Sequence, residues 1–206
     1  MPGCTVTAPL LRWLNYGAFL ATRLTRPARA SSATKRWEVQ DVPRDAFFDL
    51  ARELGNAIEP GFVPHRLPAS SRCLGVFDDD RLVSFAWFSV EPVSVLEVMQ
   101  VTFAPGDVYM HAAFTLATHR GQGLYPAIMR SAFEHFTFQG HRSLVALVRA
   151  ENVASLRAQH RTGWETVGRL RYVGKFGRFL VWRDRGCQKH HIQLASAGSM
   201  PVWALG

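Results

Sequence analysis

The chain has 206 residues, of which 48% are apolar and 19% are charged, a composition typical of a globular protein with a sizeable core. No apolar run approaches the ~18 residues of a transmembrane helix, so none is expected. The net charge is +8, but residues 1–37 hold six basic residues and no acid, which leaves 18 basic against 16 acidic residues elsewhere. This nearly neutral body does not favour nucleic-acid binding.

The N-terminal segment has its own pattern. Residues 8–24 combine leucines and a phenylalanine with two arginines, which predicts a short amphipathic helix ending before Pro27. Small residues at 30–33 indicate a linker, so residues 1–35 are expected to form a basic extension. Three interpretations stay open: a helix packed on the domain or a flexible leader, an attachment to an anionic membrane surface, and a transit peptide.

Residues 36–185 are expected to form one domain. A strand is predicted over 36–42, a helix from Pro43 through Leu54, and a proline-containing loop over 56–71. Further strands are predicted over 72–77, 82–90, 93–103 (one strand or a pair), 108–116, 143–148, 164–173 and 175–182.

Two later helices have clear signals. Apolar residues recur every four positions from Leu124 to Phe136 and predict a helix over that range. Asn152 can cap a short helix over 153–161. The order of elements predicts an α/β or α+β domain with a mixed sheet, and the Ala-, Ser- and Gly-rich tail, 186–206, is expected to be loose.

Cysteine and histidine usage excludes the common metal and disulfide frameworks. Cys4, Cys73 and Cys187 are far apart, and the eight histidines show no metal-ligand spacing. No metal is therefore expected, and a reducing cytoplasm is the simplest compartment.

The most informative segment is a glycine turn after an apolar run. Residues 113–118 lead into Arg120, Gly121, Gln122 and Gly123, and a helix follows. Such a junction gathers unpaired backbone N–H groups at the positive end of a helix dipole, which predicts a phosphate or pyrophosphate site. The spacing fits neither a P-loop, because no lysine follows, nor a dinucleotide fingerprint, because the third glycine is absent.

These residues resemble a known family. Residues 119–125 look like the acyl-CoA-binding motif R/Q-x-x-G-x-G/A of the GNAT N-acetyltransferase superfamily. Residues 151–155 and 161–164 resemble its later segment E-N-x-x-S … K-x-G-F, and the resemblance covers roughly residues 36–183. It implies a mixed, mostly antiparallel central sheet flanked by helices and splayed at the cofactor site.

The resemblance implies that backbone amides of the turn bind the CoA pyrophosphate beside Arg120. It also implies that the preceding strand end pairs with the pantetheine arm, where one N–H polarises the thioester carbonyl. Asn152 would face the pantetheine, cap its helix, or do both. The cofactor-binding residues are then Phe114, Thr115, Leu116, Arg120, Gly121, Gln122, Gly123, Leu124, Tyr125, Asn152 and Ser155.

The sequence departs from the family pattern at two informative positions. Tyr125 replaces a small residue, which predicts crowding or stacking near the cofactor. Gln159 stands where many members have a tyrosine that reprotonates the CoA thiolate. Since a thiol of pKa ~8.5 is already a fair leaving group, loss of this acid need not abolish activity.

The general base is predicted on the strand before the turn. Strand alternation would put Tyr109, His111, Ala113 and Thr115 on one face. His111, with an ordinary pKa near ~6.5, is the first candidate, and the family often has a glutamate near the position of Tyr109. Glu97 on the preceding strand is the second candidate, and a water chain is a third route.

The sequence therefore predicts an acetyl-CoA-dependent N-acetyltransferase in which a small amine or amino sugar attacks the thioester directly in a ternary complex. Acetyl-CoA is the co-substrate, and no nucleic acid is expected as a partner. The alternative is a CoA-binding module without turnover, recruited to a membrane by its basic N-terminus. In either case the protein is expected in the cytoplasm, with or without a peripheral membrane contact.

Overall fold

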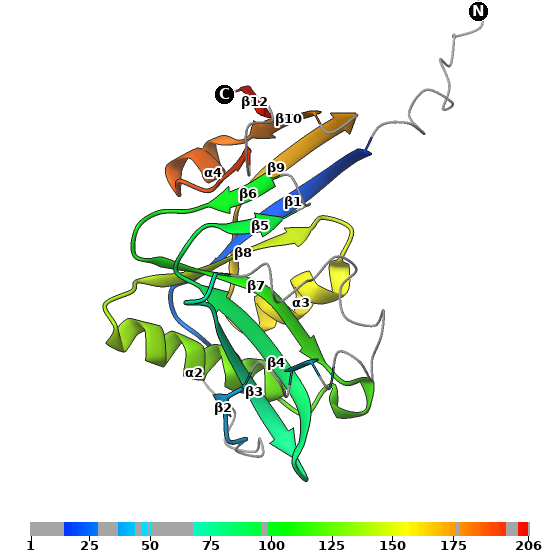
Figure 1. Ribbon diagram of the computed structural model, residues 1–206, viewed down its shortest axis with the longest axis vertical. Helices are drawn as coiled ribbons and strands as arrows, with labels where there is room; N and C mark the ends of the chain where they lie inside the picture. The colour runs from blue at the N-terminus through cyan, green and yellow to red at the C-terminus, as the bar shows by residue number, and fades with distance from the viewer. Residues whose placement is uncertain are drawn as a thin grey trace, which may run out of the picture.

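The computed structural model of the protein (Figure 1) describes residues 15–28, 37–43, 47–48, 50, 68–95, 99–175, 178–196 and 202–205. The strands are β1 (Asn15–Leu24), β2 (Gln40–Asp41), β3 (Arg72–Asp78), β4 (Arg81–Ser89), β5 (Val93–Val95), β6 (Met99–Thr102), β7 (Asp107–Thr115), β8 (Ser143–Arg149), β9 (Glu165–Lys175), β10 (Arg178–Arg183), β11 (Gln193–Ser196) and β12 (Val202–Leu205). The helices are α2 (Leu124–Phe138), α3 (Val153–Arg161) and α4 (Arg185–Lys189), with a 3₁₀ turn, η4, at Ala117–His119.

Nine strands form one sheet in the order β12-β10-β9-β1-β8-β7-β4-β3-β2, and β11, β6 and β5 form a second, smaller sheet. Most neighbours are antiparallel, but β7 and β8 run parallel. These two strands pair only from Asp107 to Tyr109, opposite Ser143 to Val145, and then separate. The mixed, mostly antiparallel and splayed sheet expected from the sequence is therefore confirmed.

Two apolar cores cover the two faces of the large sheet. Because side chains alternate along a strand, the neighbours Leu144 and Val145 of β8 belong to different cores. The Leu144 side packs against α2, whose Ile128 and Ala132 are 0% exposed, as the predicted four-residue stripe requires. Full burial of an isoleucine contributes about 1.5–3 kcal/mol, so α2 is firmly held beside the divergence of β7 and β8.

The helix predicted over 8–24 is wrong for residues 15–24, which form the strand β1 between β8 and β9. Both faces of β1 are covered: Ala21 and Leu24 are 0% exposed and belong to opposite cores. A strand buried on both faces carries apolar residues at successive positions, and this run can be mistaken for the stripe of a helix. The rest of the predicted extension, residues 1–14 and 29–35, is outside the described residues.

The loose tail predicted over 186–206 is also wrong for the part that the structure describes. Cys187 of α4 is 0% exposed and Leu194 of β11 is 4% exposed, and β11 pairs with β6. β12 then adds a parallel strand beside β10. A few apolar residues among Ala, Ser and Gly are enough to form a strand here, because the edge of a neighbouring strand supplies the backbone hydrogen-bond partners.

Most other predicted elements are confirmed. The segment 93–103 is the strand pair β5–β6, and the helix over 153–161 has the predicted ends. The strand over 36–42 shortens to Gln40–Asp41. Of the helix predicted to begin at Pro43, the structure describes helical residues at 47, 48 and 50, and the remainder, like most of the 56–71 loop, lies outside the described residues.

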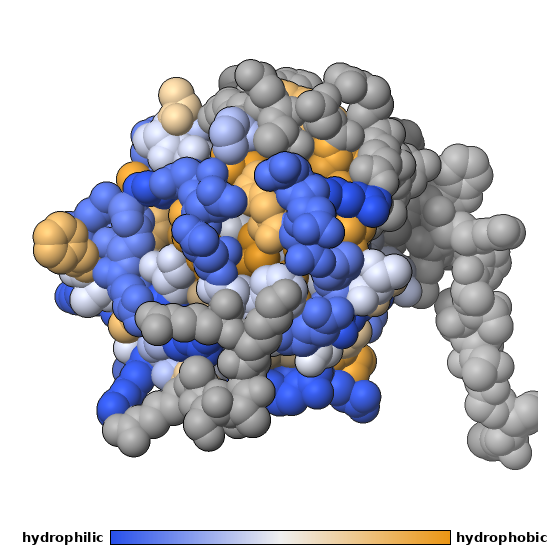
Figure 2. All heavy atoms as spheres, turned by 90° about the horizontal axis from the view of Figure 1, so that it is seen from below, coloured by the Kyte–Doolittle hydropathy of each residue, from blue (hydrophilic) through white to orange (hydrophobic). Residues whose placement is uncertain are grey.

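Seen from below, the surface is mostly hydrophilic, with a narrower apolar area between hydrophilic strips (Figure 2). Phe138, at the end of α2, is the most exposed large apolar side chain of the described residues, at 94%. None of the described helices combines the length and the apolar character needed to cross a bilayer.

Candidate functional site

A cleft of about 640 Å³ opens where β7 and β8 separate. It is bounded by the end of β7, the glycine turn, the first turn of α2 and one face of α3. The predicted cofactor residues that line it are Phe114, Thr115, Arg120, Gly121, Gly123, Leu124, Tyr125, Asn152 and Ser155. Two predicted residues, Leu116 and Gln122, do not line it.

The sequence reasoning missed several residues of α3. Ala154, Ala158, Arg161 and Thr162 also line the cleft, and with Ser155 they recur at intervals of three and four residues. This spacing places them on one face of a helix. The small residues recurring on one face of this short helix are the signal that could have identified it as a wall of a ligand cleft. Arg161, at the end of the helix, adds a positive charge.

The glycine turn presents a row of unused amide donors. Gly121 and Gly123 have φ values of 78° and 83°, in the left-handed region that favours glycine, and Gly123 precedes the first residue of α2 without any side-chain cap. The N–H groups of residues 121–125 donate no hydrogen bond to the part of the chain that the structure describes. Donors at the start of a 15-residue helix form an anion-binding site, because the helix dipole is positive there.

Other groups hold the turn in place without using these donors. Trp37 donates from Nε1 to the carbonyl oxygen of Gln122 at 2.8 Å, and Arg120 donates from Nε to the carbonyl oxygen of Thr115 at 3.2 Å. Both bonds end on carbonyl oxygens, so the amides stay available. The remaining nitrogens of the Arg120 guanidinium can still contact an anion.

The Thr118–His119 side of the turn is fixed to a neighbouring hairpin. Nε2 of His119 lies 3.2 Å from the Oδ2 of Asp78, at the end of β3. His119 also lines the cleft. The contact with Asp78 fixes the position of the His119 imidazole, and through it the position of the turn beside the cleft.

Asn152 performs its predicted capping role. Its side chain accepts a hydrogen bond from the N–H of Ser155 at 3.1 Å, and α3 begins at the next residue. The same residue lines the cleft. The two roles that the sequence left open for Asn152 are thus geometrically compatible.

The amides at the end of β7 are not equivalent. The N–H of Leu116 donates to the carbonyl oxygen of Val83 at 2.9 Å, toward β4, so Leu116 has no amide left for a ligand. Since N–H groups alternate in direction along a strand, the amide of Thr115 points away from β4, toward the divergence. Thr115 lines the cleft, so its amide can meet a ligand there, and the same alternation applies to Ala113, two positions earlier.

The prediction that Tyr109, His111, Ala113 and Thr115 share a face is wrong. Trp87 lies opposite Ala112 and Phe88 opposite Met110, so β7 carries one extra residue, His111, at a bulge. The bulge reverses the alternation: Phe114 after it stacks on Phe85 of the core that contains Tyr109. Tyr109 and Thr115 therefore lie on opposite faces.

The two base candidates that the structure describes, Tyr109 and His111, do not line the cleft. The ring of Tyr109 is 5.8 Å from that of Phe103 and 6.1 Å from that of His111. Burial lowers the pKa of His111 from 6.5 to about 4, so its imidazole is neutral at pH 7 and a weaker base than expected. Glu97 is outside the described residues.

Tyr125 and Gln159 meet below the cleft. Burial raises the pKa of the Tyr125 hydroxyl, and interactions with Gln159 and Trp164 only partly offset this effect. The hydroxyl also lies 4.0 Å from the sulfur of Met110, and Gln159 is 1% exposed. Tyr125 thus turns its phenol into the protein, where it stays protonated.

Within the ranges that the structure describes, no group of three or more His, Cys, Asp or Glu side chains could hold a metal ion. The cleft offers a ligand backbone donors, the side chains of Arg120, Arg161 and His119, and several small side chains.

Comparison with known proteins agrees with this geometry. A family model described as the acetyltransferase (GNAT) family matches residues 24–164. No curated protein matches the sequence. The family resemblance carried by the glycine turn and the later Asn152 segment is confirmed by the family model.

Three solved structures show the same fold. A protein assigned to the GNAT acetyltransferase family, from Novosphingobium aromaticivorans DSM 12444, is 18% identical, with a TM-score of 0.54 over 78% of this chain and 66% of that chain. A Drosophila protein is 13% identical, with a TM-score of 0.54 over 80% of this chain and 53% of that chain. The aminoglycoside N-acetyltransferase AAC(6')-Iy in complex with CoA is 16% identical, with a TM-score of 0.50 over 66% of this chain and 92% of that chain. The chain thus spans about two thirds of the first structure and about half of the second.

Proposed function

Because the chain belongs to the GNAT acetyltransferase family, we propose that it transfers an acetyl group from acetyl-CoA to the primary amine of a small molecule. One observation carries the proposal: five consecutive amides, at residues 121–125, have no partner in the described chain, and four of these residues line the cleft beside the point where β7 and β8 separate. Backbone N–H donors in a row can bind the oxygens of a diphosphate, and the adjoining cleft can hold a long, narrow group such as pantetheine.

The diphosphate of CoA would accept hydrogen bonds from these amides, with Arg120 and Arg161 as the nearby cations. Gly121 and Gly123 have positive φ values, and backbone of this kind can turn successive N–H groups toward one anion. The absence of a Cβ at both positions lets the phosphate oxygens approach the backbone closely.

The pantetheine arm would lie between the end of β7 and α3. Ala154 and Ala158 leave width on the helix side, and Asn152 supplies a polar group at its start. The amide of Thr115, rather than that of Leu116, would donate to the thioester carbonyl as negative charge develops on its oxygen.

In the reaction, the amine nitrogen attacks the thioester carbonyl carbon, the C–N bond forms, and the C–S bond breaks. The ammonium proton must leave, and the sulfur departs as thiolate and is protonated to CoA thiol. A neutral His111 can accept a proton, although its lowered pKa makes it a weak base; Glu97 or a water chain are the other routes. Gln159 has no titratable proton, so water would protonate the thiolate.

The proposal is tested by combining acetyl-CoA with a panel of small amines and amino sugars, and measuring thiol release and the mass of the product. Saturable acetyl transfer to at least one amine supports it. CoA binding is measured separately by calorimetry. If folded protein binds no CoA at millimolar concentration, the turn is not a diphosphate site and the transferase proposal is wrong.

A second candidate function is a CoA-binding module without turnover. The weak basicity of His111 and the replacement of a tyrosine by Gln159 favour it. The same two measurements distinguish the candidates: CoA binding with no product on any amine would favour the module. Recruitment to a membrane, predicted for residues 1–35, stays a prediction only for residues 1–14 and 29–35, since residues 15–24 form the buried strand β1.

A further inference from the structure

A second hollow, of about 610 Å³, is lined by residues of β1, β9 and β10. These three strands are neighbours in the large sheet (Figure 1). Leu20 of β1 lies opposite Arg169 of β9, and Trp182 of β10 lies opposite Arg171. Residues paired across strands share a face, so these four side chains project on one side of the sheet. No residue of this groove lines the cofactor cleft.

The groove carries two arginines that are not paired with any described acid. Arg169 and Arg171 are exposed and lie two positions apart on one strand, so their side chains emerge about 7 Å apart on the same face. Neither side chain makes an ion pair or a hydrogen bond with any described residue. Like charges on neighbouring positions repel, and a bound anion between them would relieve that repulsion.

The described lining of the groove contains one acid, Asp184, which forms no ion pair with Arg169 or Arg171. Asp184 accepts hydrogen bonds from the N–H groups of Arg169 and Cys187, both at 2.9 Å. Burial raises the pKa of Asp184, but the hydrogen bonds from Cys187 and Arg169 outweigh it and leave the pKa below its ordinary value. The carboxylate thus accepts hydrogen bonds from backbone N–H groups at the start of α4. Arg183 also lines the groove, but its side chain alternates with that of Trp182 and donates to Oε1 of Gln193 at 3.0 Å, so Arg169 and Arg171 are the two cations available to a ligand.

Apolar and aromatic surface completes the groove. Leu20 and the indole of Trp182 are partly exposed and adjoin the arginines. An arginine fork matches phosphate oxygens, and an indole face stacks on a planar ring. A hollow of this volume accommodates a ligand of nucleotide size.

We propose that this groove is a second ligand site that binds a nucleoside phosphate, with phosphate oxygens on Arg169 and Arg171 and the base against Trp182. The site is separate from the cofactor cleft and does not depend on the proposed function.

The test titrates GDP into full-length protein by calorimetry, with and without saturating CoA, because guanine is absent from CoA. Saturable binding is expected in both conditions. Replacing both arginines, Arg169→Ala with Arg171→Ala, is expected to weaken GDP at least tenfold and leave CoA binding unchanged. The matched control, Arg157→Ala with Arg185→Ala, removes two exposed charges outside the groove and is expected to change GDP binding less than twofold.

Trp182→Leu is expected to weaken GDP but not inorganic pyrophosphate. No saturable binding of GDP, AMP or UMP to the CoA-loaded protein would overturn the proposal, as would equal weakening by the control pair. Equal affinity for GDP and pyrophosphate would show that the guanine ring makes no contact in the groove and would overturn the nucleoside part of the proposal. An oligothymidylate that binds much more tightly than GDP, with a steep salt dependence, would replace the proposal with single-stranded nucleic acid.

Discussion

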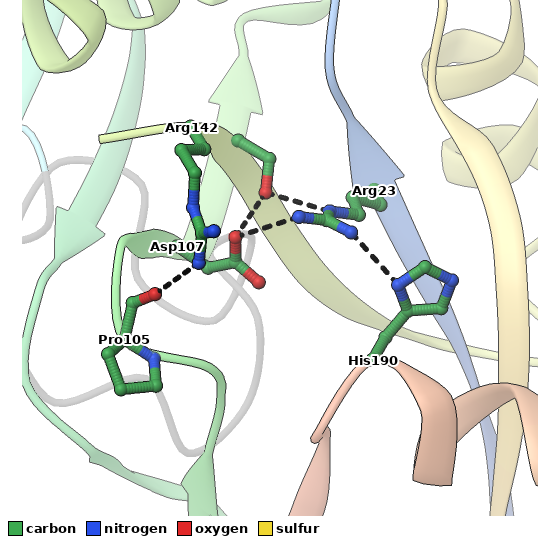
Figure 3. A network of polar contacts seen from close by, with 6 residues as sticks. Arg23, Pro105, Asp107, Arg142 and His190 are labelled. Carbon is green, nitrogen blue, oxygen red and sulfur yellow. Dashed lines mark hydrogen bonds and ion pairs between the residues drawn. The ribbon is translucent and has the colours of Figure 1, made fainter. Parts of the chain in front are cut away.

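The guanidinium of Arg23 and the carboxylate of Asp107 lie 3.0 Å apart and join β1 to the first residue of β7 (Figure 3). The side chain of Asp107 is 1% exposed and also accepts a hydrogen bond from Ser143, at the start of β8, at 2.6 Å. Arg23 donates to Nδ1 of His190 at 2.9 Å. The N-terminal strand, the two parallel strands and the C-terminal segment thus meet in one polar cluster.

Arg23→Met is expected to lower the free energy of unfolding by about 3–5 kcal/mol, because it leaves the Asp107 carboxylate buried without a cation. Urea unfolding measures the loss. The matched control is Arg149→Met, since Arg149 and Glu151 form an exposed pair at 3.6 Å, for which less than about 1 kcal/mol is expected. A loss for Arg23→Met no larger than that of the control would contradict the role of this cluster.

Stability is expected to fall as the pH drops from about 6.5 toward 4. Burial lowers the pKa of His111 to about 4, and burial also lowers the pKa of His135 and His190. The unfolded chain then binds more protons than the folded one below pH ~6.5, so stability is complete above that pH and declines below it.

His111 alone accounts for about 3 kcal/mol of this decline, which levels off below its folded pKa. Asp41 and Asp184, whose pKa values are lowered, lose their contribution only below about pH 4, so the two windows are separate. Urea unfolding at pH 7.5 and 4.5 measures the effect, and His111→Asn is expected to flatten it. An equally steep pH dependence in that variant would contradict the assignment.

Gly121→Ala is expected to weaken CoA binding at least tenfold by calorimetry, because a residue with a Cβ resists the φ of 78° that aims the amides. Gly140→Ala is the matched control: Gly140 has a φ of 91°, follows the end of α2, and like Gly121 has no atom within 4 Å of an added Cβ. Each change is expected to cost about 1–2 kcal/mol of stability. Equal CoA affinity in the two variants would place the diphosphate elsewhere.

Ala21→Asp is expected to unfold the protein or cost more than about 3 kcal/mol, because it places an unpaired charge at the 0% exposed centre of β1. Tyr16→Asp is the control on the same strand, where the side chain is 66% exposed and a change within about 0.5 kcal/mol is expected. Thermal unfolding followed by circular dichroism compares them. A folded Ala21→Asp protein of normal stability would contradict the buried position of β1 and favour a peripheral helix for this segment.

The features that the sequence predicted correctly have local causes. The glycine turn, the four-residue stripe of α2 and the Asn152 cap each depend on residues within a few positions of one another. Nine of the residues predicted to bind the cofactor line the cleft, because most of them belong to one continuous segment; their role in binding stays a prediction.

The features that it missed depend on distant partners. β1 becomes a strand because β8 and β9 bond to its two edges, and nothing within residues 15–24 identifies those partners. The bulge at His111 exists only relative to the register of β4, so alternation along β7 alone put Tyr109 and Thr115 on one face. The tail becomes ordered because β6 and β10 offer it free edges.

The position of β1 has a consequence for how the protein is made. Thr22 bonds to Ala146, 124 residues later in the chain, so an apolar strand emerges from the ribosome long before either of its neighbours has been synthesised. Contacts of such sequence separation slow folding, and an unpaired strand edge invites association with other chains. The nascent polypeptide therefore carries an aggregation risk until β9 is complete, and a chaperone that shields the first strand would raise the yield of folded protein.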